Sequence, residues 1–594
     1  MAWLNIFHTF GEGPLGKIPR ASRSSILAAV AILAAWSSCA PAQTPPSPHW
    51  WRGAVIYEIY PRSFQDSNGD GTGDLNGITS RLQYLQALGV DAIWITPMFP
   101  SPLVDFGYDI SNYEDIAPEY GTLADFDRLL SEAHRRRIRV IVDMVVNHTS
   151  DKHPWFIDAR KSTSSARHDW YVWSDGKLAP DGSRVPPNNW RSYFGESSWQ
   201  WVPSVGQFYY HAYYKEQPDL NWRNPAVEKA MFTTMRFWLD RGVDGFRLDS
   251  VPDLFEDEHL RDDSPDEGVD MLGQPRVKRT YTTNQPEIHG VIRRMRSMVS
   301  SYPGDRVLIG ETDLPDIHDL DKWYGGSQHD ELQLPMDAPV GYVNKLDVAK
   351  FRNLLTQVNT EIHGSQPLLF FDCHDTDRSW DRYGDGVHNV LIAKLVATLL
   401  LTSRATVLLY QGEELGQVTS KPTRLADVKD PVGKAFWPKF QGRDGERTPM
   451  QWDSSNAQAG FSTNSKTWLP VASNYGTVNV ASELHDPNSL LNWHKELISL
   501  RRKYRALWSG DVVMLDTQNS SVFSYARRSP DGDTVVISLN MSPMPQSVLL
   551  DKQRFKSRNS RVETLLQSGA DTRYSPANSQ ILLSPFGAWA GALN

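Results

Sequence analysis

Three short segments of the chain run through apolar residues and then reach an acidic side chain. They are GVDGFRLD at 242–249, VLIGET at 307–312 and LLFFDCHD at 368–375. A short apolar run is typical of a fully buried parallel strand, so an acid at its end lies where the sheet meets solvent. Asp249, Glu311 and Asp375 therefore mark a candidate catalytic edge.

Two of these carboxyl groups suit glycosidic bond cleavage, which needs one acid with a raised pKa and one ionised nucleophile. Arg247 lies two residues before Asp249 and hence on the same face of the strand, where its guanidinium favours the ionised carboxylate. Asp249 is thus the predicted nucleophile. Glu311, in an apolar setting, is the predicted general acid/base. Asp375, with His374 beside it, is expected to hold the sugar and to stabilise positive charge in the transition state.

The elements that would carry these acids are eight apolar runs that alternate with helix-like segments. The runs predicted as strands are 54–60, 90–96, 139–146, 242–249, 306–311, 331–336, 367–372 and 406–410. Helix-like segments lie between several of them, at 80–89, 123–137 and 226–242. Eight strand-then-helix units predict an α/β fold, a (β/α)8 TIM barrel with its catalytic face at the carboxyl ends of the strands.

Two stretches break this alternation. Residues 149–216 are rich in Trp, Tyr, Pro, Asn and Ser without a helix period, and their length predicts an inserted B subdomain after the third strand. From about residue 510 the chain turns to short alternating runs, which predict a C-terminal antiparallel β-sandwich domain at 510–594. The barrel is then built from 43–148 and 217–509.

The first 42 residues are predicted to be a signal peptide. Basic residues precede an apolar stretch at 26–36 that is too short to span a bilayer, and the A-P-A sequence at 40–42 offers a cleavage site. A lipidated Cys39 is the alternative, although Trp36 stands where such sites usually carry leucine. The protein is expected to be periplasmic or secreted, without an integral membrane span after processing. Only Cys373 then remains, so no disulfide can form within the mature chain.

The net charge of −9 is dispersed along the 594 residues without long runs of one sign, which argues against a nucleic-acid partner. The 21 tryptophans suit stacking on sugar rings, although most are expected in the core. With the paired carboxyl groups described above, a small-molecule oligosaccharide is the expected partner. The composition does not indicate an oligomeric state.

Several separated motifs give the chain a family resemblance. They are DMVVNH at 143–148, QPDLNW at 217–222, GVDGFRLD at 242–249, the Glu311 strand, the HD pair at 374–375 and RDGERTPMQW at 443–452. In this order they resemble the α-amylase superfamily of glycoside hydrolases, family 13, in its α-glucosidase and oligo-1,6-glucosidase group, from Trp50 to the C-terminus. The resemblance implies the same roles for Asp249, Glu311 and Asp375. It also implies a retaining mechanism through a covalent glucosyl–enzyme intermediate.

The same resemblance implies a pocket around the terminal, non-reducing glucose, and the blocked end of that pocket implies exo-action. The residues matched to it are Asp105, Tyr108, His148, Phe194, Tyr213, Gln217, Arg247, His374 and Arg443. A surface ion pair is the alternative interpretation of Asp105 and Arg443.

The segment DSNGDGTGDLNG at 66–77 carries oxygen-bearing residues at every second position. They are Asp66, Asn68, Asp70, Thr72 and Asp74. Alternating oxygen donors with glycines between them can wrap a hard cation, with Thr72 contributing its backbone carbonyl. Similar family members bind Ca²⁺ or Mg²⁺ here, so a structural Ca²⁺ (or Mg²⁺) away from the catalytic centre is expected. A solvated Asp/Gly-rich turn is the alternative.

Three residues depart from the family pattern or bear on specificity. Cys373 stands where the family usually has Asn before the HD pair, and Glu196 makes FGE of the usual FGG. Ser250 follows the nucleophile, where oligo-1,6-glucosidases tend to carry Val and α-1,4-selective maltases a small residue such as Ala or Thr. The resemblance therefore favours α-1,4 bonds, with maltose and short malto-oligosaccharides as substrates.

Three alternatives stay open at this point. One is an oligo-1,6-glucosidase or sucrose-hydrolysing specificity. Another is a glucosyltransferase or isomerase that uses the same three acids but passes the glucosyl group to a sugar or alcohol. The third is a non-catalytic binding subunit, which the presence of all three acids disfavours.

Overall fold

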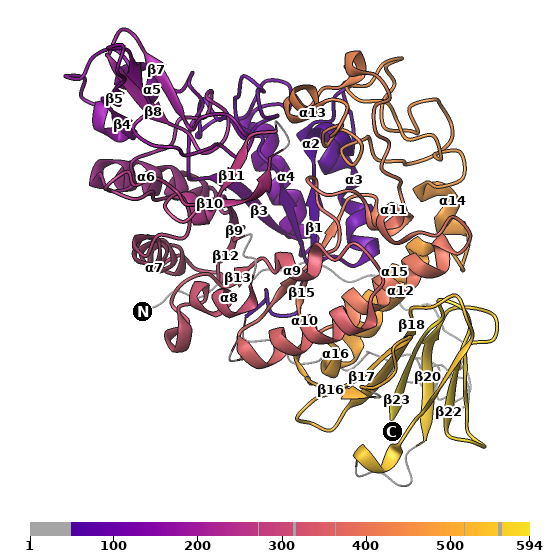
Figure 1. Cartoon of the computed structure of the whole chain (residues 1–594). Helices are drawn as coiled ribbons and strands as arrows, with labels where there is room; N and C mark the ends of the chain where they lie inside the picture. The colour runs from indigo at the N-terminus through magenta and orange to yellow at the C-terminus, as the bar shows by residue number, and fades with distance from the viewer. Residues whose placement is uncertain are drawn as a thin grey trace, which may run out of the picture. The chain divides into compact units, whose positions relative to one another are not determined.

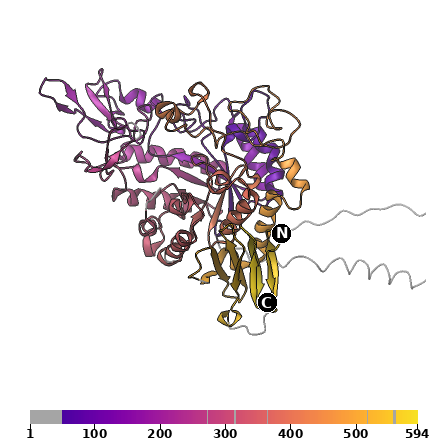
Figure 2. The ribbon, with the colours of Figure 1, turned by 45° about the vertical axis from the view of Figure 1, so that its right-hand side comes forward.

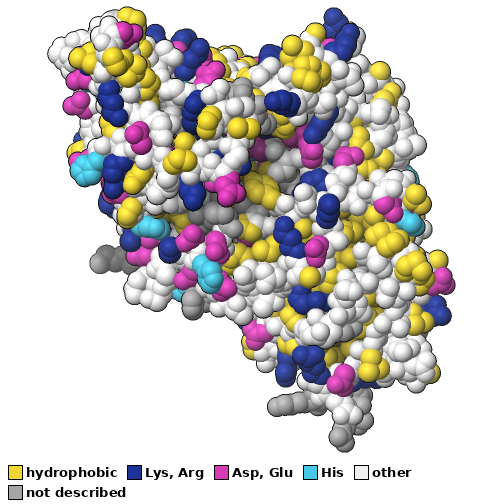
Figure 3. Space-filling view, viewed as in Figure 1, with side chains coloured by type: hydrophobic (Ala, Val, Ile, Leu, Met, Phe, Trp, Pro, Cys, Tyr) yellow, Lys and Arg dark blue, Asp and Glu magenta, His cyan; other side chains and the backbone are white. Residues whose placement is uncertain are grey.

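The computed structural model describes residues 49–593 apart from 271–272, 313–315, 363, 516 and 556–560. The predicted signal peptide and Cys39 lie outside the described residues, and export stays a prediction. Within the described ranges, no helix is long and apolar enough to cross a bilayer. On the face seen in Figure 3, basic and acidic side chains are interspersed, as the dispersed charge of the sequence predicts.

Eight parallel strands form one sheet that curves into a nearly closed barrel (Figure 1). In sheet order they are β13 Leu334–Pro335, β12 Val307–Gly310, β9 Gly245–Asp249, β3 Arg139–Val145, β2 Ala92–Ile95, β1 Val55–Ile59, β15 Thr406–Tyr410 and β14 Leu368–Leu369. A parallel bridge between Met336 and Leu368 joins the two edges of the sheet. Each predicted strand is present in its place, and the barrel prediction is confirmed.

Helices cover the outside of the barrel, and their ends follow local sequence signals. They include α3 Leu75–Leu88, α4 Leu123–Arg135, α6 Pro225–Arg241, α7 Glu287–Ser300, α8 Ile317–Trp323, α10 Val348–Glu361, α12 Asn389–Thr402 and α15 Leu490–Lys503. Helix α4 begins at a capping box in which Thr122 and Asp125 bond each other's backbone N–H groups. Helix α6 begins with Asn224 as its cap and ends at Gly242, whose φ of 103° suits a residue without Cβ.

Side chains alternate along the strands, and this places a charged layer above an apolar one inside the barrel. Ile56 and Ile141 belong to a buried apolar cluster within the barrel. Two residues further along the same strands stand Glu58 and Asp143, which share that face because the side-chain period of a strand is two. Both acids have no exposed surface. In the neighbouring strand, Arg247 is the register partner of Asp143.

Between β3 and α6 the chain forms a small subdomain outside the barrel (Figure 1). Its elements are α5 Pro154–Ala159, a 3-10 turn at His168–Trp170, a sheet of β4 Trp173–Ser174, β8 Gln207–Tyr210 and β7 Trp199–Val202, and a ribbon of β5 Lys177–Leu178 and β6 Arg184–Val185. Its own core consists largely of aromatic residues, among them Trp190, Trp199 and Phe208. The aromatic richness that predicted an insertion therefore serves to fill a core too small for a helix layer.

The C-terminal segment forms two antiparallel sheets that lie against one another, seen in yellow in Figure 2. The larger consists of β16 Asp511–Leu515, β17 Val522–Arg528, β18 Thr534–Asn540, β23 Ala588–Leu593 and β20 Val562–Gln567, and the smaller of β19 Gln546–Leu549, β22 Gln580–Leu583 and β21 Arg573–Ser575. Val536 and Trp589 of the first sheet share a buried cluster with Ile581 and Leu583 of the second. The predicted C-terminal antiparallel β structure is therefore present.

Two features near the barrel rim differ from the sequence-based expectation. A hairpin of β10 Pro265–Val269 and β11 Pro275–Val277 follows β9, where the polar sequence gave no alternating signal. Strand β14 is only two residues long and ends at Leu369, so Asp375 lies on the following loop and not at a strand end. The strand-end prediction is correct for Asp249, the last residue of β9, and for Glu311, which follows β12 directly.

Candidate active site

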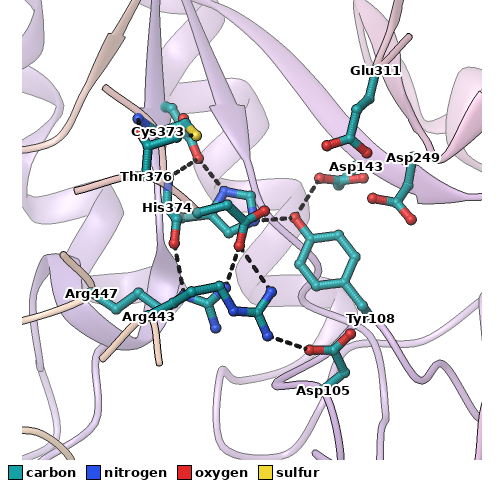
Figure 4. Close-up of polar contacts among 12 residues, drawn as sticks. Asp105, Tyr108, Asp143, Asp249, Glu311, Cys373, His374, Thr376, Arg443 and Arg447 are labelled. Carbon is teal, nitrogen blue, oxygen red and sulfur yellow. Dashed lines mark hydrogen bonds and ion pairs between the residues drawn. The ribbon is translucent and has the colours of Figure 1, made fainter. Parts of the chain in front are cut away.

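Arg247 is the centre of the site, because its guanidinium contacts three carboxyl groups. Its Nη1 donates to Asp249 Oδ1 at 2.6 Å and lies 3.2 Å from both carboxyl oxygens of Asp143. Its Nη2 lies 2.9 Å from Glu311 Oε1. Arg247 is 1% exposed. One buried cation therefore bridges the predicted nucleophile and the predicted acid/base. In Figure 4 the carboxyl groups of Asp143, Asp249 and Glu311 gather on one side of Tyr108.

Burial raises the pKa values of both of these acids, and Arg247 only partly offsets it. The pKa of Glu311 rises to about 8, since the charges of Asp249 and Asp375 add to the effect of burial. Burial raises the pKa of Asp249 to about 6 against the opposing charge of Arg247. The contact that was expected to keep Asp249 ionised is thus present but is outweighed by burial. Near neutral pH the two acids still hold the states that an acid/base and a nucleophile require.

Asp375 lies in the opposite electrostatic environment. Its Oδ1 is 2.6 Å from Arg447 Nη2 and 3.0 Å from Arg443 Nη1, and its Oδ2 is 3.2 Å from His374 Nε2. Burial favours the neutral form, but His374, Arg443 and Arg447 together outweigh it and hold the pKa of Asp375 well below its usual range. A carboxylate that stays charged suits the stabilisation of an oxocarbenium-like transition state.

Asp105 and Arg443 form a buried ion pair beside Asp375. Arg443 Nη2 donates to Asp105 Oδ1 at 3.0 Å, and Arg443 Nε donates to Asp430 Oδ2 at 2.9 Å. Gln217 Nε2 lies 3.3 Å from the other Asp105 oxygen. Asp105 is 6% exposed, so the alternative of a surface ion pair is wrong.

Tyr108 and His374 form a stacked pair between the two groups of acids. Their ring centroids are 5.5 Å apart at an angle of 8°, and Tyr108 Oη lies 2.8 Å from His374 Nε2. Tyr108 Oη also donates to Asp143 Oδ2 at 3.2 Å, and His374 Nδ1 lies 2.5 Å from Glu58 Oε1. These bonds fix the orientation of both rings toward a bound sugar.

An aromatic wall comes largely from the inserted subdomain. Phe194 stacks on Tyr214 at 4.1 Å between ring centroids, and its ring lies 6.2 Å from that of Tyr213. The Tyr213 ring lies 5.3 Å from His148, whose Nε2 is 3.0 Å from Gln217 Nε2. Burial lowers the pKa of His148 to about 3, so this imidazole is neutral. The residues matched to the glucose pocket are thus all brought together around the three acids.

The two departures from the family pattern lie in different surroundings. Cys373 is buried against the apolar cluster of the barrel, with Sγ 3.5 Å from Thr376 Oγ1. It borders the same small cavity as Glu311 and Asp375. Glu196 is exposed, and its backbone carbonyl accepts the N–H of Ser192 at 2.9 Å. Cys373 is therefore the departure that lies beside the catalytic groups.

Four further residues belong to the site and were not singled out by the sequence. They are Glu58, Asp143, Asp430 and Arg447. Asp143 and Arg447 stand inside two of the motifs quoted above, and Glu58 and Asp143 are charged residues within apolar strands. A charge in a buried strand needs a partner, which is the signal that could have identified these two. Burial raises the pKa of Asp143 to about 6 although Arg247 opposes it.

In the predicted metal loop, the buried carboxylates are already engaged by hydrogen-bond donors. Asp66 accepts bonds from the backbone N–H groups two, three and five residues further on and from the Ser462 hydroxyl. Asp74 accepts from Ser67 and caps α3 through the N–H of Gly77. A carboxylate has about four lone-pair sites, so Asp66 is saturated.

The exposed residues of the same loop follow a similar pattern. Asn68 Oδ1 accepts the N–H of Asp70, and Asp70 Oδ1 accepts the N–H of Thr72. Across the described part of the chain, no group of three or more His, Cys, Asp or Glu side chains is placed to hold a metal ion. In the folded loop Asp66 is engaged by these donors, so its binding of a cation requires it to exchange some of them for the ion.

Comparisons with known proteins identify one family of enzymes. The family model described as "Alpha amylase, catalytic domain" matches residues 58–510, which include all three acids. A "Probable alpha-glucosidase" of Rhizobium meliloti (strain 1021) is 42% identical over 510 residues, 84% of this chain and 90% of that protein. An oligo-1,6-glucosidase of Parageobacillus thermoglucosidasius is 36% identical over 570 residues, 91% of this chain and 98% of that protein.

A solved structure has the same architecture over nearly the whole chain. The crystal structure of the α-glucosyl transfer enzyme XgtA matches with a TM-score of 0.82 at 36% sequence identity. The match covers 92% of this chain and 100% of that one. The similarity therefore extends beyond the barrel to the other parts of the fold.

Proposed function

Because the chain belongs to the α-amylase family of glycoside hydrolases, we propose that it is an exo-acting, retaining α-glucosidase. Its substrates are the terminal α-glucosidic bonds of maltose and short malto-oligosaccharides, with α-1,4 bonds favoured. The observation that carries the proposal is the shared guanidinium of Arg247, which contacts Asp249 through one nitrogen and Glu311 through the other. Two carboxyl groups bridged in this way suit the short separation of about 5–5.5 Å that retention requires.

The reaction then has two steps that use the same pair of acids. Asp249 attacks the anomeric carbon while Glu311 donates its proton to the departing oxygen, which leaves a glucosyl ester on Asp249. A water molecule next gives a proton to Glu311 and attacks the anomeric carbon, which releases glucose and restores Asp249. Asp375 stays ionised in both steps and stabilises the positive charge on the sugar ring.

Exo-action follows from the closed end of the pocket. The ion pair between Asp105 and Arg443 is buried. Asp430 forms a second ion pair with Arg443, and Gln217 donates a hydrogen bond to Asp105. A chain that continued beyond the terminal glucose would have to break this pair and leave buried charges unpaired, which is costly. The pocket therefore accepts only the end of a glucan chain.

Linkage preference is tested with a panel of maltose, isomaltose, sucrose and trehalose. Since Ser250 is a small residue next to the nucleophile, we expect kcat/KM for maltose to exceed that for isomaltose by about tenfold, the size of effect that one side chain can have. Glucose release, followed enzymatically, gives the four values. Isomaltose turnover well above maltose turnover would overturn the α-1,4 preference, and no turnover of any of the four would overturn the glucosidase proposal itself.

A second candidate function is glucosyl transfer to a sugar or alcohol. It is favoured by the extent of the match to XgtA, which is described as an α-glucosyl transfer enzyme. The two functions differ only in what attacks the glucosyl ester. Products formed at high maltose concentration distinguish them: trisaccharides or isomeric disaccharides indicate transfer, whereas free glucose as the sole product excludes it.

The loop at 66–74 is proposed to bind a structural Ca²⁺ once Asp66 exchanges its hydrogen-bond donors for the ion. We then expect millimolar Ca²⁺ to raise Tm by a few degrees and a chelator to reverse the effect, because a ligand that binds only the folded state stabilises it. Asp70→Asn, which weakens an exposed ligand without disturbing the buried bonds, should remove the Ca²⁺ dependence. A Tm that is identical with Ca²⁺ and with chelator would identify the loop as a metal-free turn.

A further inference from the structure

A series of hydroxyl contacts reaches from the inserted subdomain to the nucleophile. Ser250 Oγ donates to Asp249 Oδ2 at 2.9 Å. The hydroxyl of Tyr213 lies 2.7 Å from Ser250 Oγ and 3.0 Å from Asp253 Oδ2. Ser250 and Asp253 are 6% and 4% exposed. The Ser250 hydroxyl thus donates to the catalytic carboxylate on one side, and on the other it lies against the Tyr213 phenol, which shares its single proton between Ser250 and Asp253.

The backbone conformation of Ser250 allows its hydroxyl to reach Asp249. Ser250 has a φ of 50° and a ψ of 39°, a left-handed conformation that costs a non-glycine residue of order 1–2 kcal/mol. In this conformation its N–H donates to Glu311 Oε2 at 3.1 Å while its hydroxyl reaches Asp249. One residue therefore contacts both reacting carboxyl groups, and a strained conformation at such a position is a sign of function.

The two oxygens of Asp249 are held by bonds of unequal strength. Oδ1 accepts a charge-assisted bond from Arg247 at 2.6 Å, whereas Oδ2 accepts from the neutral hydroxyl of Ser250 at 2.9 Å. Charge-assisted hydrogen bonds are roughly twice as strong as neutral ones. Oδ2 therefore keeps the more available electron pair.

We infer that Asp249 attacks through Oδ2 and that Ser250, held in place by Tyr213, is the positioning residue of that oxygen. The inference rests on the proposed retaining function. When Oδ2 attacks, it forms the bond to the anomeric carbon, the glycosidic bond breaks, and the leaving oxygen takes the proton of Glu311. When water attacks in the second step, its proton passes to Glu311 and the ester bond breaks. The electron pair of the ester bond returns to Oδ2. There the Ser250 hydroxyl donates a hydrogen bond to the carboxylate as it regains its negative charge.

The matched pair Ser250→Thr and Ser250→Val tests this role. Thr keeps the hydroxyl and Val replaces it with a methyl group of similar size, and both place the same β-branch in the same backbone conformation. The substrate is 4-nitrophenyl α-glucoside, whose good leaving group makes hydrolysis of the ester the slower step. We expect kcat of the Val variant to be about tenfold below that of the Thr variant, as for loss of a hydrogen bond to a charged group. A burst of nitrophenol is then expected in both variants, and the steady-state phase that follows the burst should be slower in the Val variant.

A third variant keeps the test decisive if Ser250→Val does not fold. Tyr213→Phe removes the phenol oxygen that contacts Ser250 and Asp253, and it should lower kcat less than Ser250→Val does, with a smaller change in KM. Equal kcat in the Thr and Val variants, or wild-type kinetics in Tyr213→Phe, would overturn the role of Ser250. A wild-type protein that releases no nitrophenol would overturn the proposed function instead.

Discussion

Replacing Asp249 with asparagine is expected to lower kcat/KM for maltose by about 10⁴-fold to 10⁶-fold, the loss that follows removal of a covalent nucleophile. The amide has no ionised oxygen to attack the anomeric carbon, and it places an N–H₂ group near the Arg247 guanidinium that now binds the carboxylate at 2.6 Å. Steady-state glucose release measures the loss. Asp127→Asn is the matched control, since Asp127 is 52% exposed on α4 and pairs with Arg241.

The role of Asp249 as the attacking group has a chemical readout as well. Asp249→Gly leaves space where the carboxylate stood, and azide can enter it and attack the anomeric carbon from the same side. With 4-nitrophenyl α-glucoside, we expect azide to restore part of the nitrophenol release and to yield β-glucosyl azide, with inverted configuration. Full activity of Asp249→Asn, or an α-configured azide product, would contradict the assignment.

Replacing Glu311 with glutamine is expected to lower maltose hydrolysis by about 10²-fold to 10⁴-fold, the usual contribution of general acid catalysis. Glutamine cannot give a proton to the departing sugar oxygen. The loss in the first step should be much smaller for 4-nitrophenyl α-glucoside, because nitrophenolate leaves without a proton. Glu287→Gln is the control, since Glu287 is 46% exposed and pairs with Arg223 at the surface.

The same variant tests the assignment through pH. In the wild type, activity should fall as pH drops through about 6, where Asp249 becomes protonated, and fall as pH rises through about 8, where Glu311 loses its proton. A bell-shaped profile of kcat/KM with its maximum near pH 7 is therefore expected. Glu311→Gln should lose the alkaline limb and keep the acid one. An alkaline limb that survives in this variant would assign the acid to another residue.

Much of this site could be predicted because several of its residues lie on strands, where every second side chain points to the same face. Arg247 and Asp249 are two residues apart on a strand, so a shared face follows directly from the sequence. The contact of Arg247 with Asp143 could not be derived in this way, because it depends on which strands are neighbours and on their register. Arg443 and Arg447 both donate hydrogen bonds to Asp375, although they lie 68 and 72 positions away from it in the sequence. These contacts depend on loops, where side chains follow no regular period.

The pKa of Asp249 was harder to predict than the positions of the catalytic residues. The arginine next to Asp249 suggested a depressed pKa, yet the pKa is raised, because burial outweighs the charge of Arg247 and the nearby charge of Asp143 adds to the effect of burial. The number of carboxyl groups around Arg247 is a property of the folded barrel and not of the local sequence. Desolvation at this depth outweighs one favourable contact.

In the proposed mechanism, the shared guanidinium of Arg247 also determines when Glu311 acts as an acid and when it acts as a base. While Asp249 is charged, it competes with Glu311 for this cation and helps to raise the pKa of Glu311. In the proposed mechanism Asp249 becomes a neutral ester, which ends that competition and leaves Arg247 to favour ionised Glu311. The pKa of Glu311 then falls after it has given up its proton, at the stage when a base is needed to activate water. In the proposed mechanism, formation of the covalent bond thus converts the acid into a base.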